Sequence, residues 1–139
     1  MSEFTVNGIT FSSMEQYMMY QKAVCFKDEE IAEKILATTD VAVIKALGRQ
    51  VKGYNDGYWN GVRQLLVYEG LKEKFTQNEN LKKLLLDTED SILAEGAVND
   101  RIWGIGLSMK DSNRLESEKW RGQNLLGYAM MMVRNWIKE

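Results

Sequence analysis

Residues 95–107 concentrate several side chains that could do chemistry within one short span. They place two carboxylates, Glu95 and Asp100, close to the indole of Trp103 and then continue into Gly104-Ile105-Gly106. A carboxylate can stabilise developing positive charge or activate water, and an indole offers a flat face to a ring or a sugar. Glycines allow close approach of the backbone. The segment therefore predicts the wall of a pocket but does not name its ligand.

A second candidate pair lies near the N-terminus. Glu15 and Lys22 are seven residues apart in a predicted helix, so they share a face and lie two turns, or roughly 10 Å, apart. The pattern also has a purely structural explanation. Glu15 follows Ser12 at capping-box spacing, and Lys22 would then be a solvated surface charge.

Basic residues accompany an indole and a glycine in the middle of the chain. Trp59 and Arg63 are i, i+4 neighbours on a predicted helix. They could be a core tryptophan with an arginine over its edge, or a pair that holds a stacked ring and a nearby phosphate. Arg49 follows Gly48 at a predicted helix end, where a cation also complements the helix dipole.

Composition excludes several classes of site. The chain has no histidine, which excludes Ser-His-Asp and Cys-His nucleophile systems, and its single cysteine excludes thiolate zinc sites. The glycines do not have the spacing of a phosphate-binding loop or a dinucleotide fold. If the protein is an enzyme, its acid–base chemistry must come from Asp, Glu, Lys or Tyr.

Length and charge bound the remaining possibilities. We expect one domain over residues 1–139, and the net charge of −2 predicts no strong sequence-independent attraction to nucleic acid. The first residues lack a basic region followed by an apolar one, so no secretory signal is expected. This and the single cysteine favour a cytoplasmic protein.

The elements that must position these residues are mostly helical. Residues 4–11 alternate around Asn7-Gly8, which predicts a β-ribbon. Helices are expected from Ser12 or Ser13 to about Phe26, after caps at Asp28 and Asp40, through Trp59 to Phe75, from Asn78 or Asn80, and from about Gly122. Gly48 is expected to end the third helix as its C′ residue. The fold class is therefore mainly α, with a small N-terminal β-ribbon.

Several short blocks occur in a fixed order along the chain. They are Ser13-Met14-Glu15-Gln16-Tyr17, Gln21-Lys22-Ala23, Lys45-Ala46-Leu47-Gly48-Arg49, Trp59 with Arg63, Lys74-Phe75-Thr76-Gln77-Asn78, Leu85-Leu86-Asp87-Thr88, Glu95 to Leu107, and Trp120-Arg121-Gly122-Gln123-Asn124-Leu125-Leu126-Gly127. Together they resemble the NADAR (YbiA-like) family, from about Gly8 to Arg134.

This resemblance implies a compact multihelical fold and hydrolysis of an N-glycosidic bond without a metal or a redox cofactor. It implies two substrate groups: ribosylamino-pyrimidine phosphates of riboflavin synthesis, and ADP-ribose attached to guanine, including guanine in DNA. It further implies a role in catalysis for Glu15 and Asp100. The substrate-binding residues that it implies are Lys22, Arg49 and Arg63 for phosphate, Trp59 and Trp103 for the base or ribose, Glu95 for loop orientation or ribose, and Asn124 for the sugar or the helix cap.

One departure from the family pattern leaves an alternative open. Family members usually carry an aromatic and asparagine-containing stretch before the ribbon, whereas only Met1 to Phe4 precede it here. The alternative is a non-catalytic module that binds ADP-ribose or a nucleotide. The sequence gives no information on oligomeric state.

Overall fold

The computed structural model describes residues 2–93, 104, 107, 117 and 124–138. The chain divides into two units, residues 1–82 and 83–139. Each unit is described separately below.

The N-terminal ribbon forms as its turn sequence predicts. Strand β1 (Phe4–Val6) pairs antiparallel with β2 (Ile9–Phe11), and Val6 lies opposite Ile9. Asn7 and Gly8 both have positive φ, 50° and 81°, as a two-residue type I′ turn requires. Phe4 and Phe11 are buried, so the ribbon covers part of the core with one face.

Helix α1 (Met14–Cys25) begins at Ser13, the second of the two serines that were expected to open it. Ser13 accepts a hydrogen bond from the backbone of Gln16 (3.1 Å), and the Gln16 side chain accepts one from the backbone of Ser12 (2.7 Å). The capping explanation for Glu15 is therefore wrong, because Gln16 fills that role. Glu15 is exposed in the first turn.

The same Gln16 side chain also joins α1 to the helix that follows. Its amide nitrogen donates to the carbonyls of Ile35 (3.1 Å) and Thr38 (2.9 Å) at the end of α2 (Glu29–Leu36). Gln16 is only 3% exposed. Because each of its polar atoms is bonded in a buried place, this one side chain fixes both the start of α1 and the end of α2.

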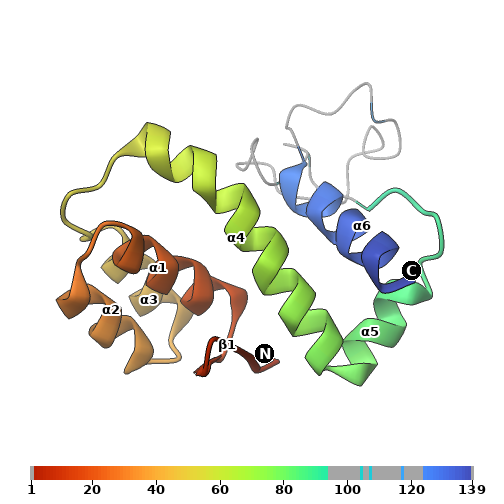
Figure 1. Ribbon diagram of the computed structural model, residues 1–139, viewed down its shortest axis with the longest axis horizontal. Helices are drawn as coiled ribbons and strands as arrows, with labels where there is room; N and C mark the ends of the chain where they lie inside the picture. The colour runs from red at the N-terminus through yellow and green to blue at the C-terminus, as the bar shows by residue number, and fades with distance from the viewer. Residues whose placement is uncertain (1, 94–103, 105–106, 108–116, 118–123, 139) are drawn as a thin grey trace. The chain divides into compact units, whose positions relative to one another are not determined.

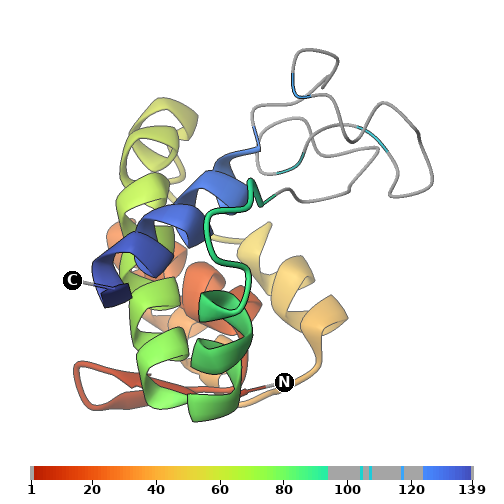
Figure 2. The same ribbon diagram turned by 90° about the vertical axis from the view of Figure 1, so that its right-hand side faces the viewer.

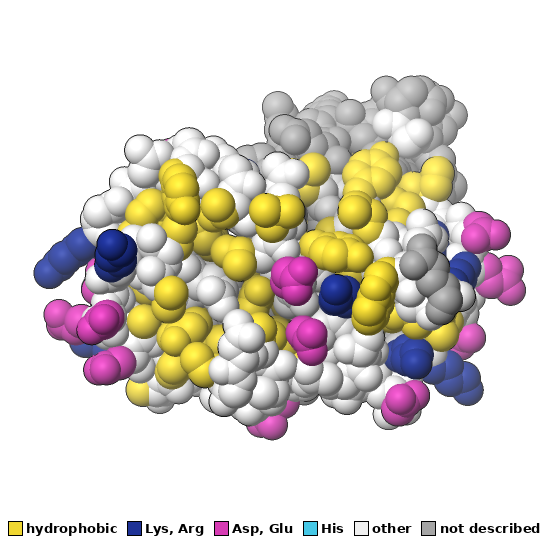
Figure 3. All heavy atoms as spheres, viewed as in Figure 1, with side chains coloured by type: hydrophobic (Ala, Val, Ile, Leu, Met, Phe, Trp, Pro, Cys, Tyr) yellow, Lys and Arg dark blue, Asp and Glu magenta, His cyan; other side chains and the backbone are white. Residues whose placement is uncertain are grey.

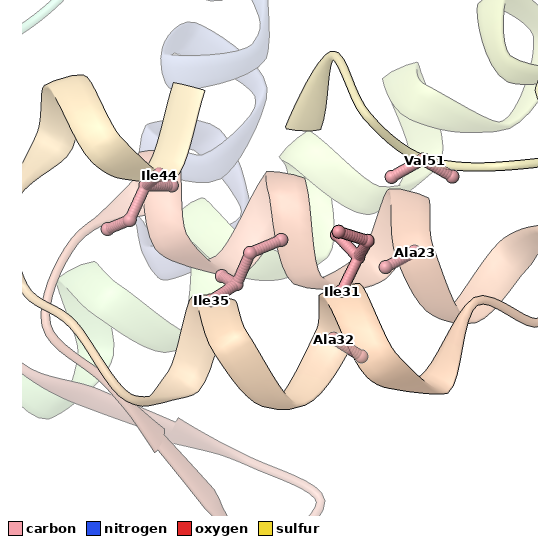
Figure 4. Packing of buried hydrophobic residues seen from close by; sticks show 6 residues of the cluster. All are labelled: Ala23, Ile31, Ala32, Ile35, Ile44 and Val51. Atoms are coloured by element: carbon pink, nitrogen blue, oxygen red, sulfur yellow. The ribbon is translucent and has the colours of Figure 1, made fainter. Parts of the chain in front are cut away.

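Helices α1, α2 and α3 (Val41–Gly48) lie side by side (Figure 1). Asp28 caps α2 and Asp40 caps α3, so both predicted caps are confirmed. Their facing side chains, together with one residue after α3, form a buried apolar cluster (Figure 4). It consists of Ala23, Ile31, Ala32, Ile35, Ile44 and Val51.

Gly48 is the last residue of α3 and not the C′ residue that was predicted, because the C-cap is Arg49 with φ −74°. A Cβ atom at position 48 would lie 2.1 Å from the sulfur of Met19 on α1. A larger residue at position 48 would therefore require the Met19 side chain to move.

Helix α4 (Asp56–Gln77) begins at Asn55, which accepts a hydrogen bond from the backbone of Tyr58 (2.9 Å). It packs closely on α1 at Gly70, where a Cβ atom would lie 2.6 Å from the ring of Tyr17. Figure 2 shows the β-ribbon passing across the C-terminal end of α4. There the Gln77 side chain exchanges hydrogen bonds with the backbone of Thr5.

The second unit contains α6 (Leu125–Lys138), and α5 (Glu79–Leu86) includes the boundary between the units. Arg134 and Lys138 of α6 bind Thr88 and Glu89 in the segment after α5, at 2.8 and 2.9 Å. The described helices are not long and apolar enough to cross a membrane. The prediction of a mainly α fold with an N-terminal ribbon is confirmed.

Replacing Gln16 with alanine should lower the free energy of unfolding by about 2–3 kcal/mol, because several hydrogen bonds are lost and buried backbone groups are left without them. Urea denaturation measures the change. The matched control is the neighbouring Glu15→Gln, which should stay within about 0.5 kcal/mol because this side chain is exposed. Equal stability of the two variants would contradict the role assigned to Gln16.

Candidate functional site

The three cations predicted to bind phosphate lie close enough to Tyr54 or to one another for their charges to interact. Lys22 comes from α1, Arg49 from the end of α3, and Arg63 from α4. The Lys22 ammonium lies 4.4 Å from the centre of the Tyr54 ring. The charge of Arg49 acts on the pKa of Lys22, and the charge of Arg63 acts on the pKa of Tyr54. The fold therefore brings these three sequence-distant residues to one place.

The pKa of Lys22 is lowered from its ordinary value. Burial is the main cause, and the positive charge of Arg49 lowers this pKa further. The carboxylate of Asp56 acts in the opposite direction. An anion bound between Lys22 and Arg49 would relieve their repulsion, and a phosphate oxygen suits both groups as a hydrogen-bond acceptor.

Asp56 is held by neutral donors. The Tyr54 hydroxyl donates to one of its oxygens (2.6 Å), and the Asn60 amide donates to the other (3.1 Å). The hydrogen bond to Asp56 is the main cause that raises the pKa of Tyr54. Within the part of the chain that the structure describes, neither Lys22 nor Arg49 has an acidic partner within 4.0 Å.

The loop between α3 and α4 is fixed at several points. Asp28 accepts a hydrogen bond from the backbone of Lys52 (2.9 Å), which is the main reason that the pKa of Asp28 is lowered. Val51 is buried, Gly53 adopts a φ of 74°, and Asn55 caps α4. These anchors set the backbone on both sides of Tyr54.

Open aromatic surface lies beside the cations. Tyr54 and Tyr58 are 43% and 59% exposed, and both contact Phe26 edge-on, with ring centres 5.5 and 6.1 Å away. Trp59, by contrast, is only 5% exposed, as the core-tryptophan interpretation requires. Sequence reasoning missed both tyrosines. The available signal was their position within and just after the glycine-bounded stretch 53–57.

Glu15 lies on the same helix as Lys22, two turns before it. Within the described ranges it makes no hydrogen bond or ion pair. The fold thus leaves this carboxylate exposed and uses Gln16 for the structural task. A role of Glu15 in catalysis stays a prediction.

The remaining predicted residues belong to the second unit. Asn124 is fully buried with a φ of 53°, and its side-chain amide donates to the Leu93 carbonyl (2.8 Å). Its own carbonyl accepts from Tyr128 in the first turn of α6, so it organises the start of that helix. Sugar binding by Asn124 stays a prediction, and Glu95, Asp100 and Trp103 lie outside the described residues.

The charged side chains do not form a broad patch of one sign on the face of the molecule that is drawn in Figure 3. On the face shown in Figure 3, acidic and basic side chains are scattered among apolar ones. No group of three or more His, Cys, Asp or Glu side chains in the described segments could hold a metal ion. Phosphate binding by Lys22 and Arg49 therefore stays a prediction that depends on their local arrangement and not on a broad basic surface.

Replacing Arg49 with glutamine should raise the pKa of Lys22, because one of the causes that lowers it is removed. Asp56→Asn should lower the same pKa, because the favourable charge is lost. NMR titration of the Lys22 side chain measures both shifts. Opposite signs are expected, and equal pKa values in all three proteins would contradict the site as described.

The same titration has a consequence for stability. Between the lowered pKa of folded Lys22 and the ordinary value of 10.5, the unfolded chain binds more protons than the folded one. The contribution of Lys22 therefore makes the fold more stable as pH rises through that window. Arg49→Gln brings the pKa of folded Lys22 closer to the ordinary value. The free energy of unfolding of this variant should therefore rise less with pH over this range than that of the wild type.

Comparison with known proteins places the whole chain in one family. The model of the NADAR domain matches residues 1–138. An N-glycosidase of Acanthamoeba polyphaga mimivirus is 39% identical over 132 residues, which cover 93% of this chain and 78% of that protein. The N-glycosidase YbiA of Escherichia coli is 32% identical over 132 residues, covering 95% of this chain and 74% of that protein.

Two further similarities agree with this placement. A riboflavin biosynthesis protein of Vibrio vulnificus is 33% identical over 135 residues, covering 97% of this chain and 33% of that protein. The NMR structure of the E. coli protein YbiA matches with a TM-score of 0.79 and 29% identity over 98% of this chain and 73% of that one. The chain therefore belongs to the NADAR domain family and is an enzyme of the N-glycosidase class.

Proposed function

We propose that the enzyme hydrolyses the bond between a phosphate-bearing ribose and a nitrogen heterocycle. Its preferred substrate in this proposal is ADP-ribose attached to guanine. The observation that carries this proposal is the gathering of Lys22, Arg49 and Arg63 around Tyr54. Cations from three elements suit the two phosphoryl groups of a diphosphate.

The aromatic surface beside the cations supports the same substrate. Tyr54 and Tyr58 are partly exposed aromatic side chains that a base could contact, and ADP-ribosylated guanine carries a base at each end. The second candidate is a ribosylamino-pyrimidine phosphate of riboflavin synthesis. It is favoured by the name of the Vibrio vulnificus relative.

The chemistry needs two carboxylate roles. Cleavage leaves positive charge on the ribose C1′ and its ring oxygen, while the electrons of the C–N bond pass to the departing base, which takes up a proton. One carboxylate stabilises this charge, and one removes a proton from the water that attacks C1′. Glu15 and Asp100 are the candidates for the two roles. This hydrolysis requires neither a metal ion nor a redox cofactor.

Glu15→Gln should lower kcat for release of ADP-ribose from ADP-ribosylated guanosine by about 100-fold or more, because the carboxylate is lost. The Kd for ADP-ribose should change little, since the cations remain. The matched control is Glu29→Gln, which changes an exposed acid in the first turn of α2. Equal turnover by the two variants would remove Glu15 from the mechanism.

A parallel assay on the two substrates tests the proposed specificity. We expect a higher kcat/KM for ADP-ribosylated guanine in DNA or nucleoside form than for the ribosylamino-pyrimidine phosphate. The opposite preference would assign the enzyme to the second substrate group. Saturable binding of ADP-ribose without turnover of either substrate would instead support a binding module.

A further inference from the structure

Asp56 is an exposed carboxylate close enough to Lys22 to affect its charge, yet both of its oxygens are held by neutral groups. The Tyr54 hydroxyl donates to Oδ1 at 2.6 Å, and the Asn60 amide donates to Oδ2 at 3.1 Å. Across the described ranges, no ion pair joins Asp56 to Lys22 or Arg49. The charge of Asp56 nevertheless acts on Lys22 and raises its pKa.

The ammonium of Lys22 lies over the Tyr54 ring instead, 4.4 Å from its centre. An aromatic face attracts a cation but, unlike a carboxylate, does not neutralise it. One tyrosine therefore contacts the cation with its ring and the competing anion with its hydroxyl. From this position the charge of Asp56 opposes the effect of Arg49 on the pKa of Lys22. Asp56 does so without forming an ion pair with Lys22 in the described part of the chain.

We propose that Tyr54 is a positioning residue that keeps the Lys22 and Arg49 pair open to a phosphate group, with its hydroxyl restraining Asp56 and its ring holding Lys22. This inference rests on the proposed function, which assigns phosphate to the same pair. Asn60 restrains the second oxygen of Asp56 and has the weaker part, since its hydrogen bond is the longer one.

The loop that carries Tyr54 is held by contacts that do not involve the tyrosine hydroxyl, so the hydroxyl can be removed without changing the loop. The backbone beside Tyr54 is fixed by the Asp28 bond to Lys52 and by the Asn55 cap, neither of which uses the tyrosine hydroxyl. Tyr54→Phe should therefore keep the ring in place and release only Asp56. Asp56→Asn removes the charge that could then pair with Lys22.

The experiment is a double-mutant cycle with inorganic pyrophosphate as the probe and the Kd measured by NMR titration of the full chain. With Asp56 present, Tyr54→Phe should weaken binding about fivefold, the effect of a new ion pair that competes for Lys22. With Asn at position 56, the same change should have no effect. A hydroxyl with a merely structural role would weaken binding equally in both backgrounds, and that result would overturn the inference, as would an unchanged Kd in Tyr54→Phe.

Two further measurements separate this inference from the proposed function. Thermal unfolding of all four proteins confirms that each is folded under the conditions of the titration. Lys22→Met should weaken pyrophosphate binding in the wild-type background. If it does not, the phosphate role of the pair fails and the inference fails with it. If it does, and the cycle shows no coupling, only the role of Tyr54 is overturned.

Discussion

The buried amide of Gln16 is the interaction on which the first unit depends. It completes the cap of α1 and holds two carbonyls at the end of α2, so it fixes the relation between the two helices. The apolar cluster between α1, α2 and α3 forms on this arrangement. Because the amide fills the structural role, the adjacent carboxylate of Glu15 stays exposed on the helix that also carries Lys22.

Close helix packing then determines where the cations lie. Gly48 lets α3 approach α1 at Met19, and Arg49 follows it as the C-cap. The next residues pass the buried Val51 and the hydrogen bond between Asp28 and Lys52 before they reach Tyr54. Lys22 and Arg49 are thus brought together by apolar packing and backbone hydrogen bonds, although their charges repel each other.

In the proposed function this pair of cations binds a phosphate group. Burial and the charge of Arg49 both disfavour protonated Lys22, and the charge of a bound phosphate would oppose them by favouring the protonated form. The net charge of −2 gives no strong sequence-independent attraction to nucleic acid, and the face shown in Figure 3 carries charges of both signs. This agrees with the proposed recognition of a phosphate-bearing ribosyl substrate by a few local side chains.

Short-range signals in the sequence determined the elements of the fold. The Asn7-Gly8 turn and the caps at Asp28 and Asp40 were predictable because each depends on residues only a few positions apart. The cap of α1 was predicted within one residue, since two serines and two suitable partners compete at that spacing. The ordered motifs pointed to the family, which the comparisons confirm.

Only the tertiary structure decided how these elements serve a site. Gly48 had the sequence signal of a helix end, but its contact with Met19, 29 residues away, gives it a packing role. Trp59 turned out to be buried, while Tyr54 and Tyr58 supply the open rings. The grouping of Lys22, Arg49 and Arg63 around Tyr54 has no local signature. It arises from helix packing between distant segments, whereas caps and turns arise from hydrogen bonds within one segment.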